Sequence, residues 1–483
     1  MIQINESGSP TPQFRVLKDE QCNEIYLATL KCLSRVGVIV DYPPALDLLA
    51  SSGARIEGNR AYIPADIIQN ALGSAPRTFT IWGRDQRHDL QITPGRVHFG
   101  PGPTCTYFYD PITGERRKAG RGDAGLTARV CDYLDQIDYI MSLSLYDDVT
   151  PVLSPVYEFA DMVTNTVKPI IAWANDPATL ADIYNIAIEV AGSEESLRKK
   201  PLFALFACYE SPLRHPKNPI ANMLWAAEHD IPVIYLGGPT VGLESPATSA
   251  SALVIYLAAV LSGLAIVQLK RCGAPVVLGG LPSPMDLRTA RPAYGSPEMS
   301  LHSAAAAELA HFLGLPFMST AGASDSKVLD SQAALETSLQ ILLSALSGAS
   351  LVHDVGFLDC ADIGSLELLV VTDEIIAMVK RIMRGVEVST KTLNLDLIEK
   401  VGPGGNFLSE VKSAMLCKSE IWIPTLMDRN AYAIWEKEGS LRMEDRVKKK
   451  LIKILDTHQP PALPAGVNEK IDNILAEAEK RYQ

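Results

Sequence analysis

The chain has 483 residues, 47% of them hydrophobic, and a formal net charge of -12. This length can bury a large core, as roughly two to four domains or as one barrel with additions. The acidic balance argues against a nucleic-acid-binding surface. The polar N-terminus has no hydrophobic signal core, and the eight scattered cysteines include no C-x-x-C pair. These features predict a cytoplasmic protein with reduced thiols.

Residues 1–95 mix helical and strand patterns. The segment 19–37 has apolar residues at helical spacing and ends at Gly37. The stretches "TFTIWGRD" and "HDLQIT" alternate like strands of a small sheet. We therefore expect an N-terminal α+β segment that packs on the body that follows.

Residues 96–385 repeat a pattern of a short apolar strand followed by a helix. Segments rich in β-branched and aromatic residues predict strands buried on both faces. Such a series of βα units favours an α/β fold of the (β/α)₈ TIM-barrel type. A doubly wound sheet is the alternative, but no G-x-G-x-x-G follows the first strand. The predicted strands are 97–102, 139–146, 169–175, 202–209, 232–238, 275–281, 316–322 and 350–357.

Two further segments have helical patterns. The uncharged segment 247–268 is long enough to cross a membrane, but its Ser, Thr and Gln268 and its place between two strands favour a buried helix. Residues 386–483 predict a C-terminal helical segment, which packs on the barrel or on a second subunit. We expect a homo-oligomer that contacts neither membrane nor nucleic acid.

In a TIM barrel the carboxyl ends of the strands form the site. The predicted ends carry aromatic residues, whose ring faces attract a quaternary ammonium; the alternative is that they cap the core. Paired glycines at three ends let a flat ligand approach closely, or simply form tight turns. The sequence has no metal-ligand cluster, no Walker lysine and no nucleophile elbow.

The chain resembles the trimethylamine methyltransferase family, in its branch without pyrrolysine. The resemblance covers nearly the whole sequence and includes "VHFGPGPT", "GAPVVLGGLPSPMDLRTARPAYGSPEMSL", "AGASDSKVLDSQAALE" and "TDEIIAMVKRIMRGVEV". It implies a TIM barrel that moves a methyl group from a methylated amine to the Co(I) corrinoid (cobalamin) of a separate protein. No corrinoid would be bound tightly by this chain. The pyrrolysine of relatives would fall in or near "DSKVLD", close to Val328.

The missing pyrrolysine fits a change of substrate. A quaternary ammonium already carries its charge, so methyl transfer releases a neutral tertiary amine without a proton donor. Glycine betaine is the leading substrate, followed by carnitine, γ-butyrobetaine and proline betaine. The alternatives are a tertiary or secondary methylamine, with His353 or Lys327 as proton donor, and a non-catalytic betaine-binding homologue.

The expected site combines rim residues with the loop "GASDSKVLDSQAALE", which carries several polar side chains after an apolar strand. We predict His353, Asp325 and Lys327 as catalytic residues, although His353 could be structural and Asp325 could cap a turn. The predicted substrate-binding residues are Tyr107, Tyr146, Trp173, Tyr209, Glu210, Arg288 and Phe357. The glycines predicted to face the corrinoid are Gly100, Gly102, Gly237, Gly238, Gly279 and Gly280.

Overall fold

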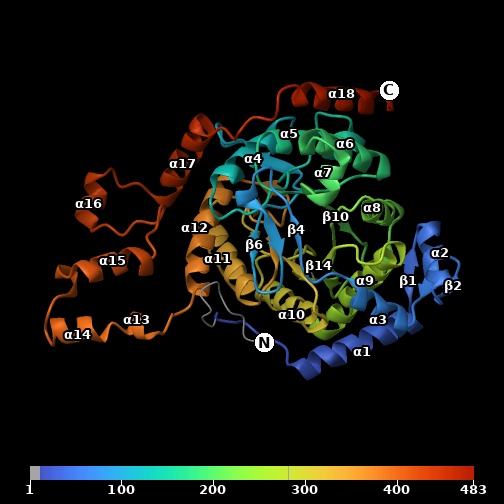
Figure 1. The fold of residues 1–483 in the computed structure, drawn as a ribbon, viewed down its shortest axis with the longest axis horizontal. Helices are drawn as coiled ribbons and strands as arrows, with labels where there is room; N and C mark the ends of the chain where they lie inside the picture. Colours follow the sequence, from blue (N-terminus) through green and yellow to red (C-terminus); the bar gives the residue numbers. More distant parts are fainter. Residues whose placement is uncertain (1–10, 281, 483) are drawn as a thin grey trace.

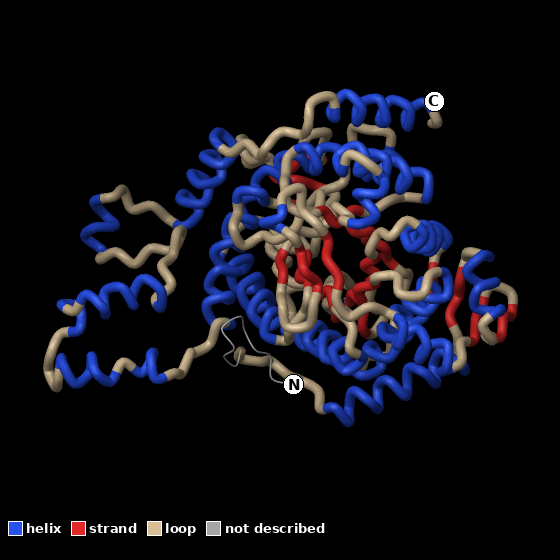
Figure 2. The backbone as a smooth tube through the Cα atoms, in the orientation of Figure 1, coloured by secondary structure: helices blue, strands red, loops and turns tan. Residues whose placement is uncertain are grey.

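The computed structural model describes residues 11–280 and 282–482. Its centre is a parallel sheet of seven strands in the order β6-β17-β16-β14-β12-β10-β9. The sheet curls on itself inside a ring of helices (Figure 2). Its strands are β6 (His98–Phe99), β9 (Ile170–Ala172), β10 (Phe203–Cys208), β12 (Val233–Leu236), β14 (Val276–Gly280), β16 (Phe317–Thr320) and β17 (Leu351–His353).

The two edge strands, β6 and β9, are joined by residues 138–140. The Asp138 N–H donates to the Phe99 carbonyl over 2.7 Å, and Ile140 forms a parallel bridge with Ile170. The predicted strand 139–146, the second in chain order, is thus present only as this short bridge. Leu143 has a φ of 69°, a left-handed conformation that ends the extended chain. The closure confirms the predicted TIM-barrel class.

Helices follow the strands as the sequence predicts. Their ends have local causes: Asp176 caps α6 by accepting the Thr179 N–H, and Gly192 ends it with a left-handed φ. Asp330 caps α11 through the Ala333 N–H. The helices around the sheet are α4 (Asp123–Tyr133), α5 (Ser154–Thr164), α6 (Pro177–Ala191), α7 (Glu194–Lys199), α8 (Lys217–Glu228), α9 (Ser249–Lys270), α10 (Pro297–Leu313), α11 (Ser331–Leu346) and α12 (Leu366–Met383).

A hairpin of β4 (Phe79–Ile81) and β5 (Leu90–Ile92) closes one end of the barrel. Its buried Ile81 and Leu90 share one core with side chains of the barrel interior, including Met318. The Trp82 N–H donates to the Pro201 carbonyl just before β10, so this is the end where strands begin. The opposite end, where strands finish, is left for the functional site.

The rest of the N-terminal segment forms a layer beside the barrel, at the right of Figure 1. Its sheet has the order β11-β1-β3-β2 and includes a strand from the loop after β10. The layer therefore shares a sheet with the barrel. The domain boundaries at residues 95 and 385 stay predictions. The elements are α1 (Asp19–Arg35), β1 (Val38–Val40), α2 (Pro43–Ser51), β2 (Arg55–Glu57), β3 (Arg60–Tyr62), α3 (Ala65–Ser74) and β11 (Arg214–His215).

Helix α9 contains most of the uncharged segment for which a membrane span was the alternative. It is long and apolar enough to cross a bilayer, but 78% of its most hydrophobic window is buried inside the protein. Helices α1, α3 and α8 pack against it. The prediction of a buried helix is therefore confirmed.

The C-terminal residues are helical, in two parts. Helix α17 (Met443–Thr457) packs on α12 and α4, and α18 (Val467–Lys480) packs on α6 and α5. The preceding residues, 386–441, stand away from the barrel at the left of Figure 1. We call them the arm. Its helices are α13 (Thr390–Leu393), α14 (Leu395–Val401), α15 (Val411–Glu420) and α16 (Tyr432–Lys437).

Candidate active site

A cleft of about 570 Å³ opens where β9 and β10 end. It lies at the open end of the barrel, where the sequence places the site. Cys208 ends β10 and lines the cleft, where its side chain is exposed. The lining residues are Ala174, Asn175, Cys208, Tyr209, Glu210 and residues 216–219.

Trp173 lies at the end of β9, beside this cleft. Its Nε1 donates to Oε2 of Glu158 over 2.9 Å, while the Ser154 hydroxyl donates to Oε1 over 2.6 Å. Glu158 is fully buried in α5, and burial raises its pKa to about 7. Glu158 is not among the residues that the sequence predicts for the site, because it lies on a helix and not at a strand end. Its available signal was a carboxylate inside the apolar stretch "SPVYEFADMV".

His353 is buried at the end of β17. Its Nε2 lies 2.9 Å from the Thr320 hydroxyl, and its Nδ1 lies 2.6 Å from Oδ1 of Asp354 without the alignment of a hydrogen bond. Its ring meets Phe206 of β10 edge-on, with centroids 5.7 Å apart. Because Phe206 belongs to the interior core, His353 points into the barrel. His353 thus lies in the barrel interior, next to an unpredicted carboxylate, and its catalytic role stays a prediction.

The predicted glycines leave room for side chains of the protein itself. A Cβ on Gly102 would overlap Asp354 and the buried ring of Phe357. The rings or side chains that crowd the other four are Tyr139 at Gly100, Tyr209 at Gly237, Leu236 at Gly279 and Tyr256 at Gly280. Gly238 lies half-buried in the loop after β12. Contact of these glycines with a corrinoid stays a prediction.

Two of the predicted aromatic residues already interact with other groups of the protein. The guanidinium of Arg116 lies 3.2 Å from the ring centroid of Tyr107, so one face is already covered by a cation. The Tyr146 hydroxyl donates to Asp161 over 2.7 Å and accepts the N–H groups of Gly122 and Ala124. Tyr146 therefore holds the start of α4.

Tyr209 and Glu210 line the cleft, whereas Arg288 does not. The Tyr209 hydroxyl is buried without a hydrogen-bond partner among the described residues. Glu210 is exposed and lies 3.7 Å from Arg214. The Arg288 side chain is 90% exposed and pairs with the neighbouring Asp286. Lys217, which was not predicted, supplies a cation at the cleft.

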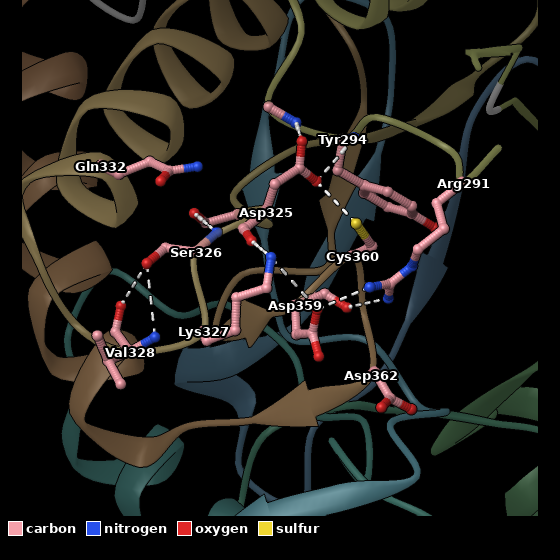
Figure 3. A network of polar contacts seen from close by, with 12 residues as sticks. Arg291, Tyr294, Asp325, Ser326, Lys327, Val328, Gln332, Asp359, Cys360 and Asp362 are labelled. Carbon is pink, nitrogen blue, oxygen red and sulfur yellow. Dashed lines mark hydrogen bonds and ion pairs between the residues drawn. The ribbon is translucent and has the colours of Figure 1, made fainter. Parts of the chain in front are cut away.

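The loop after β16 uses its charged groups to fasten itself (Figure 3). The Asp325 carboxylate accepts the N–H groups of Tyr294 and Gly295, each over 3.0 Å, and the Cys360 thiol over 3.1 Å. The Lys327 ammonium is exposed and donates to the Asp325 carbonyl over 2.7 Å. Asp325 therefore connects three rim loops, those that follow β14, β16 and β17.

The loop that Asp325 contacts after β17 has an unusual backbone. Asp359, Cys360 and Ala361 all have φ between 50° and 66°, a conformation that costs free energy for residues other than glycine. Asp359 pairs with Arg291 over 3.1 Å and lies 3.6 Å from Lys327. These contacts hold the turn in place. Within the described ranges, no group of three His, Cys, Asp or Glu side chains is placed to hold a metal ion.

Comparisons with known proteins agree with this architecture. The family model for trimethylamine methyltransferase (MTTB) matches residues 3–482. Trimethylamine methyltransferase MttB2 of Methanosarcina mazei is 33% identical, over 96% of this chain and 95% of its own. Trimethylamine methyltransferase MttB of Desulfitobacterium hafniense is 30% identical, over 96% and 94%. Glycine betaine methyltransferase of Desulfitobacterium hafniense is 29% identical, over 98% and 99%.

Among solved structures, the monomethylamine methyltransferase MtmB of Methanosarcina barkeri is similar, with a TM-score of 0.54 and 11% identity. The match covers 92% of this chain and 88% of that chain. A hydroxylamine complex of MtmB gives a TM-score of 0.55. At this identity the similarity shows a shared fold.

Proposed function

We propose, because the chain belongs to the trimethylamine methyltransferase family, that it moves a methyl group from a quaternary amine to a corrinoid carried by a separate protein. The relatives are named methyltransferases, and this chain is a methyltransferase. Glycine betaine is the leading substrate, since one relative acts on it by name. Carnitine, γ-butyrobetaine and proline betaine have the same reacting group.

The chemistry needs positioning more than proton transfer. Attack on a methyl carbon breaks one C–N bond, and its electron pair stays on nitrogen, so a neutral tertiary amine leaves. The corrinoid of the partner protein, as the second substrate, supplies the Co(I) nucleophile. The chain must orient the methyl group and exclude water.

The cleft and the neighbouring end of β9 offer the groups for this task. The ring faces of Trp173 and Tyr209 attract a trimethylammonium group. Glu158 holds the indole of Trp173 through its hydrogen bond. Lys217 lines the same cleft and provides a cation for a substrate carboxylate. We propose that the corrinoid ring approaches the barrel at the six glycines of the strand ends.

The observation that carries the choice of a quaternary amine is the structure of the loop after β16. Asp325 and Lys327 make contacts within the rim loops. Because Asp325 and Lys327 are engaged in these contacts, we propose that neither side chain protonates a leaving amine. A quaternary substrate needs none, because its nitrogen is already charged.

A spectroscopic assay with a Co(I) corrinoid tests the proposal. We expect methylation of the corrinoid with one of the four betaines and no methylation with trimethylamine. Turnover of trimethylamine without any betaine would contradict the choice of substrate. Calorimetric binding of a betaine without methyl transfer would instead identify a binding protein.

One observation favours a tertiary methylamine as the second candidate. His353 faces the barrel interior and lies 2.6 Å from a carboxylate oxygen of Asp354, an arrangement that suits a proton donor. In that case trimethylamine would be turned over by the native protein, and His353→Gln would lose that activity.

A further inference from the structure

The arm, residues 386–441, exposes an exceptional amount of apolar surface. Exposed hydrophobic side chains recur along its length, and several are more than 60% exposed: Val388, Leu395, Leu408, Val411, Met415 and Ile423. Within the arm, the buried side chains are those of Leu397 and Leu426. The arm therefore has almost no core of its own.

The helices of the arm are too short to be stable alone. They have 4, 7, 10 and 6 residues, whereas isolated helices shorter than about 12–15 residues are marginal in water. Such helices depend on packing against another surface. In Figure 1 the arm's own barrel does not provide it, because α13–α16 stand clear of the barrel helices.

The direction of the arm is nevertheless fixed. Glu374 is buried in α12, and its carboxylate accepts the N–H groups of Thr425, Leu426 and Met427 over 2.8 to 3.2 Å. Arg381 of the same helix donates to the Glu420 carbonyl over 3.0 Å. These hydrogen bonds fix the point at which the arm leaves the body, so the arm has a defined position at its base.

The body carries a second uncovered apolar surface. Leu335 and Leu339, one helical turn apart on α11, are 70% and 44% exposed. Leu301 and Phe312 on the neighbouring α10 are also exposed. We call these four residues the α10–α11 stripe. Helices α10 and α11 lie beside α12, on the side of the barrel from which the arm departs (Figure 1).

We infer that the arm packs on the α10–α11 stripe of a second copy of this chain. One pairing covers both apolar surfaces, and a two-fold exchange covers them on both copies at once, as a closed interface requires. A partner that delivers a methyl acceptor must leave in every cycle. It would repeatedly expose these apolar side chains to water, whereas apolar surfaces are typical of permanent interfaces.

The mass of the full-length protein in solution tests the inference. Light scattering should show a species of two or more chains. The double variant Leu408→Asp/Val411→Asp in the arm and the double variant Leu335→Asp/Leu339→Asp on α11 should each shift it to the single chain. Lys412→Asp and Ser331→Asp, at exposed positions of the same helices, should leave the mass unchanged.

Hydrogen exchange of the native protein keeps the test decisive if a variant fails to fold. On dilution, amides of the arm and of α11 should lose protection together. A single-chain native mass would overturn the inference. So would dissociation by the arm variant while the α11 variant keeps its mass, because that result requires another surface to receive the arm.

Discussion

The position of the Trp173 indole at the mouth of the barrel depends on one buried carboxylate. Glu158 accepts its N–H from α5, behind the strand ends. Burial opposes ionisation of Glu158, and the donated hydrogen bonds of Ser154 and Trp173 only partly offset it, so its pKa rises to about 7. Glu158 thus orients an indole that lies beside the cleft.

Replacement of Trp173 tests the proposed cation site. In Trp173→Leu the ring is lost, and a cation–π contact in a desolvated site contributes about 2 kcal/mol. We expect KM for the quaternary amine to rise roughly thirtyfold. Trp173→Phe, which keeps a ring face, should lose less. Steady-state kinetics of both variants measure this, and equal KM values for the two variants and the native protein would exclude the site.

Replacement of Glu158 by Gln changes the pH dependence of stability. The folded pKa of about 7 lies above the unfolded value near 4.5, so the native protein loses stability as pH rises between these values. The variant has no such proton, so its unfolding free energy relative to native should increase by up to about 1.4 kcal/mol per pH unit in this range. Above pH 7 the difference should stay constant.

Thermal unfolding at pH 5, 6, 7 and 8 measures the effect. Glu210→Gln is the matched control, because that carboxylate is exposed, and its curve should run parallel to that of the native protein. A Glu158→Gln curve that also runs parallel would show that Glu158 titrates normally.

At the scale of elements, the loop after β16 is a structural fastening at the site rim. Its carboxylate joins the loops that follow β14, β16 and β17. The polar residues that suggested catalysis make hydrogen bonds between these loops, and Asp330 in the same loop caps α11. A predicted general acid or base would need to reach the interior, as His353 does.

Asp325→Asn separates these two roles. Loss of a general acid or base costs roughly a hundredfold to ten-thousandfold in rate. The N–H groups of Tyr294 and Gly295 bind different oxygens of Asp325, and Asn keeps an oxygen for only one of them. We therefore expect Tm to fall and methyl transfer to stay within about tenfold of native. Asp330→Asn, in the same loop, is the control. A thousandfold loss of kcat with unchanged Tm would make Asp325 catalytic.

At the scale of the whole molecule, the C-terminal segment divides into a covering and an arm. Helices α17 and α18 cover barrel helices, whereas the arm projects and is anchored by Glu374. Burial opposes ionisation of Glu374, but the N–H groups of residues 425–427 outweigh it and hold its pKa below the ordinary value. The ionised carboxylate therefore stabilises the fold above the unfolded pKa, and this contribution is lost as pH falls.

Glu374→Gln should loosen the arm from α12. Loss of charge-assisted hydrogen bonds from a buried group costs about 2 kcal/mol, so residues 419–427 should exchange amide hydrogens faster than in the native protein. Glu387→Gln, an exposed carboxylate at the start of the arm, is the control. Unchanged protection in Glu374→Gln would show that other contacts, such as those of Arg381, anchor the arm.

The sequence by itself determined the barrel, the buried α9, the helical C-terminus and the family, because these depend on local periodicity and on long ordered motifs. It also placed His353 and Trp173 at strand ends. Glu158 lies on α5, and only the structure shows that its carboxylate meets Trp173 at the end of β9. Asp354 directly follows His353 in the sequence, but only the structure shows that its carboxylate lies 2.6 Å from the ring.

Tertiary structure also decided which polar residues are free to act. Tyr146 and Asp325 have the right residue types at the rim, yet their hydrogen-bonding groups are used by neighbouring loops. A sequence lists donors and acceptors but not their partners. The partners come from segments far apart in the chain, and only the closure of the barrel brings them within hydrogen-bonding distance.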